Sequence, residues 1–320
     1  MEIFILTLSL ILQAAVLRHL SDLSDTSQHC TAEPARRWAF AACLCSLAAT
    51  ALQLAPDHAS LQWRTAALHL AVVGQLTPFI CILGARRPGV SAWPYFVIVP
   101  MIAVFQWPSI SQLMAESADT PIIIERPSSI GLILVVVMGV GNYFGTRFTA
   151  AALLSGLGIV LQHLAVSEWT VDEWVAPANG WLIGIGSVAV SSAVLMVQFP
   201  RPVADNHVAA WQELWTDYRD VFGIVWAKRV ADRVNQFAAR ETWTLQLTLD
   251  GFVPVGQSES MTSPIPAGND EIGSRESAVL CWILRRFVDR GFLERYVPEY
   301  QIPPQTGPLD QPPTPGAEKA

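Results

Sequence analysis

Three polar side chains that could bind a ligand or carry a proton lie inside long apolar stretches of this 320-residue sequence: His69, Gln75 and Asn142. An imidazole exchanges a proton near neutral pH, and a side-chain amide both donates and accepts hydrogen bonds. Polar groups at membrane depth are costly, so they mark functional positions or bind to one another. These three residues are therefore the candidate site.

The spacing of these residues does not predict a metal centre. His69 and Gln75 are six positions apart, which places them about 120° apart around one helix. No second histidine or carboxylate lies one turn from His69. His163, in another apolar stretch, is expected near the outer end of its helix, close to water. We therefore expect hydrogen bonds between helices, with a ligand or proton role as the alternative.

The sequence lacks the motifs of well-known enzymes and retinal proteins. It contains no G-x-x-x-x-G-K-[ST], H-E-x-x-H or G-x-S-x-G. Retinal would need a lysine inside the last apolar stretch, but the two lysines are Lys228 and Lys319. We expect no catalytic residue, metal or cofactor, and no resemblance to a known family is specific enough to name.

Seven apolar stretches in the first 200 residues must position the candidate side chains. Residues 1–200 contain eight arginines and no lysine. A membrane-spanning helix needs roughly 20 predominantly apolar residues. The predicted spans are approximately 2–20, 38–55, 62–84, 92–107, 130–146, 148–166 and 178–199. Because Glu2 rather than a positive residue precedes the first stretch, we expect a retained helix and not a signal peptide.

The arginines between the spans predict the orientation. Arg64 and Arg126 lie on one side, while seven arginines lie on the other: Arg18, Arg36, Arg37, Arg86, Arg87, Arg147 and Arg201. Positive residues favour the cytoplasmic side, so the N-terminus is predicted outside and the C-terminus inside. The count of seven spans requires a tight turn at Arg147; a merged fifth and sixth span would give six.

Two G-x-x-x-G sequences predict close helix packing, at Gly141 to Gly145 and at Gly180 to Gly184. Small residues at this spacing let helix backbones approach each other in lipid. The alternative interpretation is a substrate path beside the small-residue face of the last span.

Residues 201–297 have the pattern of a small α+β domain. We expect a helix, or a helix pair broken near Gly223, over 206–240, and a strand over 243–249. An Asp250-Gly251 turn leads into a second strand, and another helix follows over 275–290. Trp211 and Trp215 are expected to be exposed as an anchor. The proline-rich tail over 298–320 is predicted to be disordered.

The fold predicted from the sequence is thus an all-α bundle of seven spans, a cytoplasmic α+β domain and a disordered tail. The leading functional hypothesis is a scaffold or sensor in the lipid bilayer that recruits a cytoplasmic protein partner through residues 206–297. The alternative is a small-solute transporter or channel. Both halves are mildly acidic, which argues against nucleic acid as a partner. Short loops and the excess of arginine over lysine favour a bacterial inner membrane.

Overall fold

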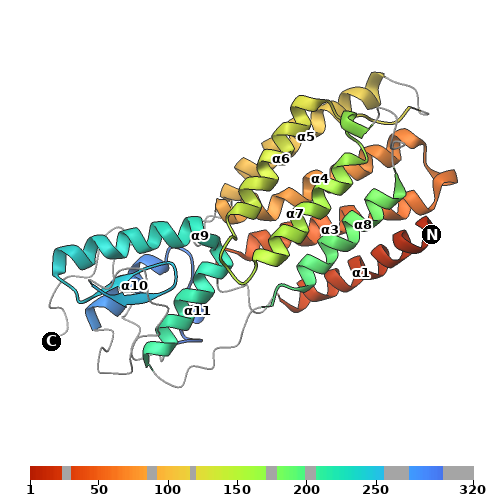
Figure 1. The fold of residues 1–320 in the computed structure, drawn as a ribbon. Helices are drawn as coiled ribbons and strands as arrows, with labels where there is room; N and C mark the ends of the chain where they lie inside the picture. Colours follow the sequence, from red (N-terminus) through yellow and green to blue (C-terminus); the bar gives the residue numbers. More distant parts are fainter. Residues whose placement is uncertain are drawn as a thin grey trace. The chain divides into compact units, whose positions relative to one another are not determined.

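The computed structural model describes residues 1–23, 30–84, 92–115, 120–170, 179–198, 207–255 and 274–297 (Figure 1). The chain forms two compact units. The first, here the membrane unit, comprises Met1–Ser27, Ala32–Gly84 and Ser91–Gln198; the second, the C-terminal unit, comprises Gln28–Thr31, Ala85–Val90 and Phe199–Ala320. The predicted tail over 298–320 lies outside the described residues.

The described part of the membrane unit is helical. Its helices are α1 (Glu2–Asp22), α3 (Glu33–Leu54), α4 (Leu61–Leu83), α5 (Ala92–Ala115), α6 (Arg126–Gly141), α7 (Thr149–Leu164) and α8 (Gly180–Leu195), with short 3-10 helices η1 (Pro56–His58) and η2 (Glu168–Thr170). Within the described residues, α1, α3, α4 and the Tyr95–Ala115 part of α5 are long and apolar enough to cross a membrane. Helices α6, α7 and α8 have 16 residues each, or roughly 24 Å of helix. Seven crossings therefore stay a prediction.

Several helix boundaries differ from the predicted spans, because proline and turn residues set them as well as hydropathy. Helices α3 and α6 begin about five residues early, each with a proline in the first helical turn. Helix α5 continues through Pro108 to Ala115, eight residues beyond the predicted end. Helices α6 and α7 are separate, and turns over 142–148 join them around Arg147.

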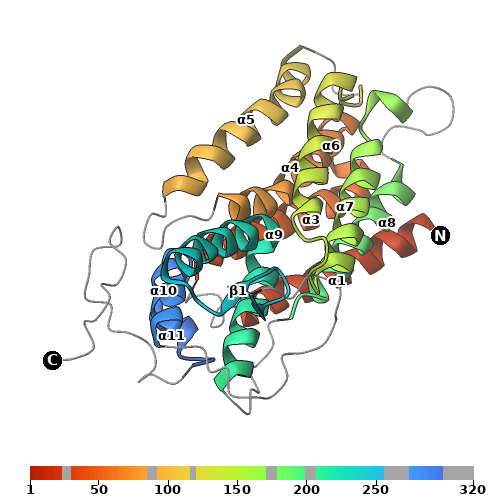
Figure 2. The ribbon, with the colours of Figure 1, turned by 60° about the vertical axis from the view of Figure 1, so that its left-hand side comes forward.

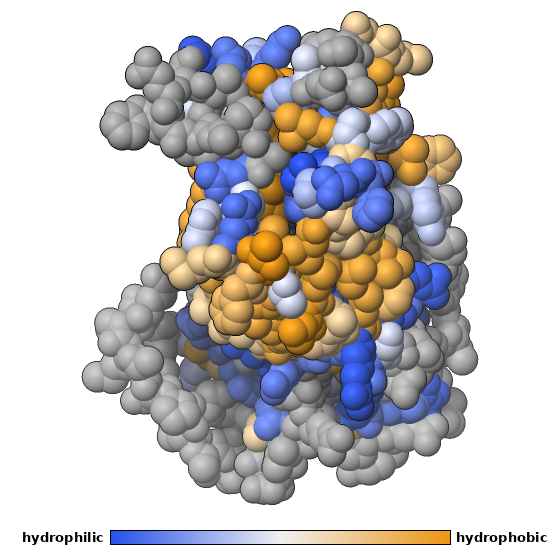
Figure 3. All heavy atoms as spheres, turned by 90° about the vertical axis from the view of Figure 1, so that its right-hand side faces the viewer, coloured by the Kyte–Doolittle hydropathy of each residue, from blue (hydrophilic) through white to orange (hydrophobic). Residues whose placement is uncertain are grey.

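The membrane unit has apolar side chains both inside and on its surface. Leu68, Val72 and Ile159 are fully buried in a core formed by α4, α6 and α7. Phe96 and Val104 of α5, in contrast, are 74% and 70% exposed. Figure 3 shows a broad continuous area of apolar residues on one face of the molecule. A surface of this kind suits a hydrocarbon solvent.

The C-terminal unit is a small α+β structure. Its elements are α9 (His207–Glu241), β1 (Leu245–Leu247), β2 (Phe252–Pro254), α10 (Ser274–Leu284) and α11 (Arg290–Leu293) (Figure 2). Helix α9 is broken at Gly223, whose φ of 79° is strained for other residues, as the sequence predicts. The two strands pair antiparallel, with Leu245 opposite Pro254. Helix α10 ends six residues before the predicted boundary.

Aromatic side chains form the core of this unit. Trp211, Trp215, Tyr218 and Phe222 recur on one face of α9 and are fully buried. The Tyr218 ring lies 4.9 Å from that of Phe222 and 5.7 Å from that of Trp215. The prediction that Trp211 and Trp215 are exposed anchors was wrong. Their spacing of four residues places them on the inner face of the helix, against the hairpin and α10.

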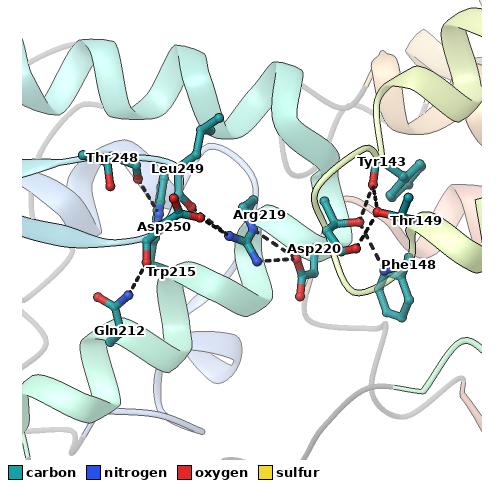
Figure 4. Close-up of polar contacts among 11 residues, drawn as sticks. Tyr143, Phe148, Thr149, Gln212, Trp215, Arg219, Asp220, Thr248, Leu249 and Asp250 are labelled. Atoms are coloured by element: carbon teal, nitrogen blue, oxygen red, sulfur yellow. Dashed lines mark hydrogen bonds and ion pairs between the residues drawn. The ribbon is translucent and has the colours of Figure 1, made fainter. Parts of the chain in front are cut away.

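Polar contacts join α9 to the hairpin. The indole Nε1 of Trp215 donates to the Thr248 carbonyl at 2.9 Å (Figure 4). Arg219 donates to the Leu249 carbonyl at 3.0 Å and forms an ion pair with Asp220. The turn has Leu249 and Asp250 at its centre, because Thr248 and Gly251 exchange backbone hydrogen bonds. The predicted Asp250-Gly251 turn is thus present but shifted by one residue.

The connection between α1 and α3 contributes to the C-terminal unit. Cys30 forms an antiparallel bridge with Val288, and the Thr31 N–H donates to the Phe287 carbonyl at 2.8 Å. The described residues of this unit therefore come from two distant parts of the sequence.

Candidate functional site

His69 lies at the meeting point of three helices. Its side chain is 1% exposed on α4, and its Nδ1 is 2.7 Å from Ser109 Oγ on α5. The ring of His163, on α7, lies 6.3 Å away between centroids. The structure therefore joins two histidines that are 94 positions apart in the sequence. We call His69, Ser109 and His163 the histidine site.

His163 is the least satisfied member of this site. It is fully buried, and within the described part of the chain neither ring nitrogen has a hydrogen-bond partner. A neutral imidazole carries one donor and one acceptor, and burying either without a partner costs about 1–3 kcal/mol. The His163 ring can therefore both donate to and accept from a small polar species.

The expectation that His163 lies near water was wrong, because an extended segment covers this end of the bundle. The Ile122 N–H donates to Thr65 Oγ1 at 2.9 Å, one turn before His69. The Ile124 N–H donates to the Val166 carbonyl at 2.7 Å, just beyond His163. Both isoleucines are fully buried. This apolar cover separates the histidine site from solvent.

Gln75 belongs to a second polar group, which we call the amide pair. Gln75 Nε2 donates to Gln162 Oε1 at 3.1 Å, and Gln162 Nε2 donates back to Gln75 Oε1 at 3.2 Å. Gln75 also donates to Ser46 Oγ of α3 at 2.8 Å. Since Gln162 directly precedes His163, the amide pair fixes the turn of α7 that carries the histidine.

Asn142 does not join His69 and Gln75. It follows the last residue of α6, in the connection to α7, and it is buried. His163 lies fourteen residues after the start of α7 at Thr149, or roughly 21 Å along the helix axis. The third candidate residue is thus at the opposite end of the α6–α7 hairpin.

Of the two predicted G-x-x-x-G contacts, the one at Gly180 and Gly184 is confirmed, and the one at Gly141 and Gly145 is absent among the described residues. A methyl group built on Gly141 or Gly145 meets nothing within 4 Å, and Gly145 has a φ of 78° in the turn. Gly180 and Gly184 lie against Glu2 and Ile5 of α1.

The backbones approach most closely at two other glycines. A methyl group on Gly158 of α7 would lie 2.6 Å from the Gly186 carbonyl oxygen of α8. The reciprocal distance, from Gly186 to the Gly158 carbonyl, is also 2.6 Å. Sequence reasoning missed this pair because the two glycines are on different helices. Gly158 accepts a hydrogen bond from Gln162 at 3.3 Å, so this contact adjoins the amide pair.

The site offers few metal ligands. No group of three or more histidine, cysteine, aspartate or glutamate side chains could hold an ion among the residues that the structure describes. The five cysteines form no disulfide. The chemistry available to the histidine site is proton exchange and hydrogen bonding to a small polar species.

Comparison with protein-family models, curated proteins and solved structures finds no match to this chain. Function therefore has to be argued from the site alone.

Proposed function

We propose that this chain is a sensor in a bacterial inner membrane: its membrane unit takes up a small polar ligand or a proton at the histidine site. Its C-terminal unit then acts on a cytoplasmic protein partner. The observation that carries the proposal is His163: it is buried, neither ring nitrogen has a hydrogen-bond partner among the residues that the structure describes, and its ring lies 6.3 Å from that of His69. A residue of this kind gains hydrogen bonds when a ligand enters.

The arrangement of the chain supports a sensor with a cytoplasmic output. Cys30 and Thr31, from the connection between α1 and α3, belong to the same compact unit as the C-terminal residues, and Arg18, Arg36 and Arg37 lie in the helices on either side of that connection. A compact unit lies on one side of a membrane, so the connection between α1 and α3 is on the same side as the C-terminal residues. The arginine count makes that side cytoplasmic.

Nitrogen-15 NMR of the full chain in lipid vesicles tests the histidine site. Subtracting the spectrum of His163→Gln isolates the signals of His163. We expect at least one ring nitrogen with the shift of a hydrogen-bonded or protonated imidazole. Signals of a free neutral imidazole at both nitrogens would contradict uptake of a ligand or proton.

Capture of a partner from native membranes tests the output. His163→Leu should change the amount of one specific captured protein at least fivefold, at equal levels of the chain in the membrane. His58→Leu is the matched control, because His58 lies exposed in η1. The sensor would be refuted if the unmodified chain, His163→Leu and His58→Leu captured equal amounts of the partner, or if none of them captured a specific protein.

A small-solute transporter is the second proposal, and prolines in the helices of the histidine site favour it. Pro108 directly precedes Ser109 in α5, and Pro78 lies inside α4. Proline removes a backbone hydrogen bond and lets a helix bend, as broken transporter helices do. Loss of solute flux in vesicles with His163→Leu, and not with His58→Leu, would support transport.

A further inference from the structure

Three arginines of the C-terminal unit lie over aromatic rings, and we call them the arginine face: Arg229, Arg233 and Arg286. The guanidinium carbons are 4.9 Å from the Trp226 ring, 5.1 Å from the Phe237 ring and 5.3 Å from the Trp282 ring, respectively. The Phe237 and Trp282 rings contact each other at 5.9 Å. Arg233 and Arg286 therefore flank one aromatic pair, although they come from α9 and from the turn after α10.

Residues 201–320 carry 12 basic and 16 acidic residues, and the exposed acids Asp232 and Asp289 lie close in sequence to the arginine face. All three arginines are exposed. Arg285 adds a further charge, and burial followed by the positive charge of Arg286 lowers its pKa. Asp217 and Asp220, from the first half of α9, are buried.

Stacking suits the arginines to bind phosphate. A guanidinium is planar and presents N–H groups that match two phosphate oxygens at once, and contact with a ring restricts its motion. Less side-chain freedom is then lost on binding than for an unsupported arginine. Arg233 also donates to Gln236 Oε1 at 2.9 Å, and the nearby Lys228 forms an ion pair with Asp232.

A short stretch of chain connects this surface to the second predicted span. Arg286 precedes Phe287, whose carbonyl accepts the hydrogen bond from the Thr31 N–H. Thr31 is seven residues from Trp38, where the second predicted span begins. Only a short stretch of chain therefore connects this edge of the unit to the predicted span.

We propose that the arginine face binds the anionic phosphate headgroups of the cytoplasmic leaflet. The proposal rests on the cytoplasmic placement of the C-terminal unit but not on the histidine site. Each basic residue near an anionic membrane contributes attraction equivalent to about a fivefold change in binding. Two arginines together should change the docked-to-undocked ratio about 25-fold.

The test uses the full chain in nanodiscs of phosphatidylcholine, with or without 30 mol% phosphatidylglycerol. A fluorophore on an unnatural amino acid at position 239, an exposed site on α9, reports energy transfer to a labelled lipid headgroup. Transfer should be higher with phosphatidylglycerol and should fall at high salt, because salt screens exposed charges. Both leaflets have one composition, so the orientation of the chain does not affect the result.

The variant Arg233→Gln/Arg286→Gln should lose the increase produced by phosphatidylglycerol. The matched control, Lys228→Gln/Arg290→Gln, removes the same charge at two residues that form ion pairs with acids one turn away. It should keep the increase. Near-UV circular dichroism checks that both variants are folded, and Arg233→Ala/Arg286→Ala, which removes the same two charges, replaces the glutamine variant if that one is not folded.

Two results would overturn the proposal. The first is equal energy transfer in both lipid compositions, or equal loss in the arginine and control variants. The second is the absence of a lipid effect together with binding of a short DNA duplex or polyglutamate that depends on Arg233 and Arg286. The arginine face would then bind a soluble polyanion instead of lipid.

Discussion

The amide pair should couple α4 to α7 by a measurable free energy. Replacing Gln75 and Gln162 with leucine, singly and together, keeps nearly the same side-chain volume and removes the two reciprocal hydrogen bonds of 3.1 and 3.2 Å. A side-chain hydrogen bond between membrane helices contributes about 0.6 kcal/mol on average and at most about 1.7 kcal/mol. Two bonds therefore predict a coupling energy of roughly 1–3 kcal/mol in a double-mutant cycle.

The two single substitutions should differ in their cost. Gln75→Leu removes both amide bonds and the 2.8 Å bond to Ser46, and it leaves Gln162 with only the Gly158 carbonyl. Gln162→Leu leaves Gln75 bonded to Ser46. Each change removes three hydrogen bonds, but Gln75→Leu takes the partner of the buried Ser46 hydroxyl, whereas Gln162→Leu releases only a backbone carbonyl inside helix α7. Because leaving a buried polar group without its partner costs more than losing a bond, Gln75→Leu should be the more destabilising change.

The measurement is equilibrium unfolding of the full chain in mixed micelles of increasing SDS content, followed by tryptophan fluorescence. Gln106→Leu is the control: Gln106 is buried in α5, and its Nε2 has no hydrogen-bond partner within the described residues. That change should be neutral or stabilising. A coupling energy under about 0.3 kcal/mol, which is within ordinary additivity, would refute the reasoning. So would a cost of Gln106→Leu equal to that of Gln75→Leu.

Two further predictions concern packing and burial. Gly158→Ala should destabilise the chain by about 1–3 kcal/mol in the same SDS titration, because its methyl group meets the Gly186 carbonyl at 2.6 Å. Gly141→Ala, with nothing within 4 Å, should be neutral, and equal costs for the two changes would contradict the model of α7–α8 contact. Burial raises the pKa of the Cys281 thiol from 9.0 to about 12. At pH 8 its thiolate fraction is about 1000-fold lower than in the unfolded chain. Iodoacetamide labelling followed by mass spectrometry should slow at least that much on folding, and similar rates in the two states would refute the burial.

Elements that depend on local sequence could be predicted. Hydropathy placed a helix in each of the seven apolar stretches, and period-two alternation before Asp250 placed the hairpin. Gly223 was identified as a break because few other residues tolerate its conformation. The boundaries were less accurate, since proline begins α3 and α6 outside the apolar stretches.

The site could be predicted only in part, because it depends on how helices pack. His69 and Gln75 stood out as polar residues in one apolar stretch, but their partners Ser109, Gln162 and His163 lie on other helices. Spacing within one helix shows which residues share a face and not which helix that face meets. The same limit explains the glycines: G-x-x-x-G identifies spacing along a single helix, whereas Gly158 and Gly186 come together across two.

The depth of His163 shows how the amide pair and the histidine site depend on each other. From its position near the end of α7 this side chain should meet water, yet it is fully buried, as are Ile122 and Ile124 of the segment that bonds to both helices. Their segment is held at Thr65 on one side and at Val166 on the other, so it joins the helices of both histidines. The amide pair fixes the same two helices from within. A ligand that moved His163 would therefore have to move α7 against α4, which disturbs both sets of hydrogen bonds, and this coupling is what a sensor of the proposed kind requires.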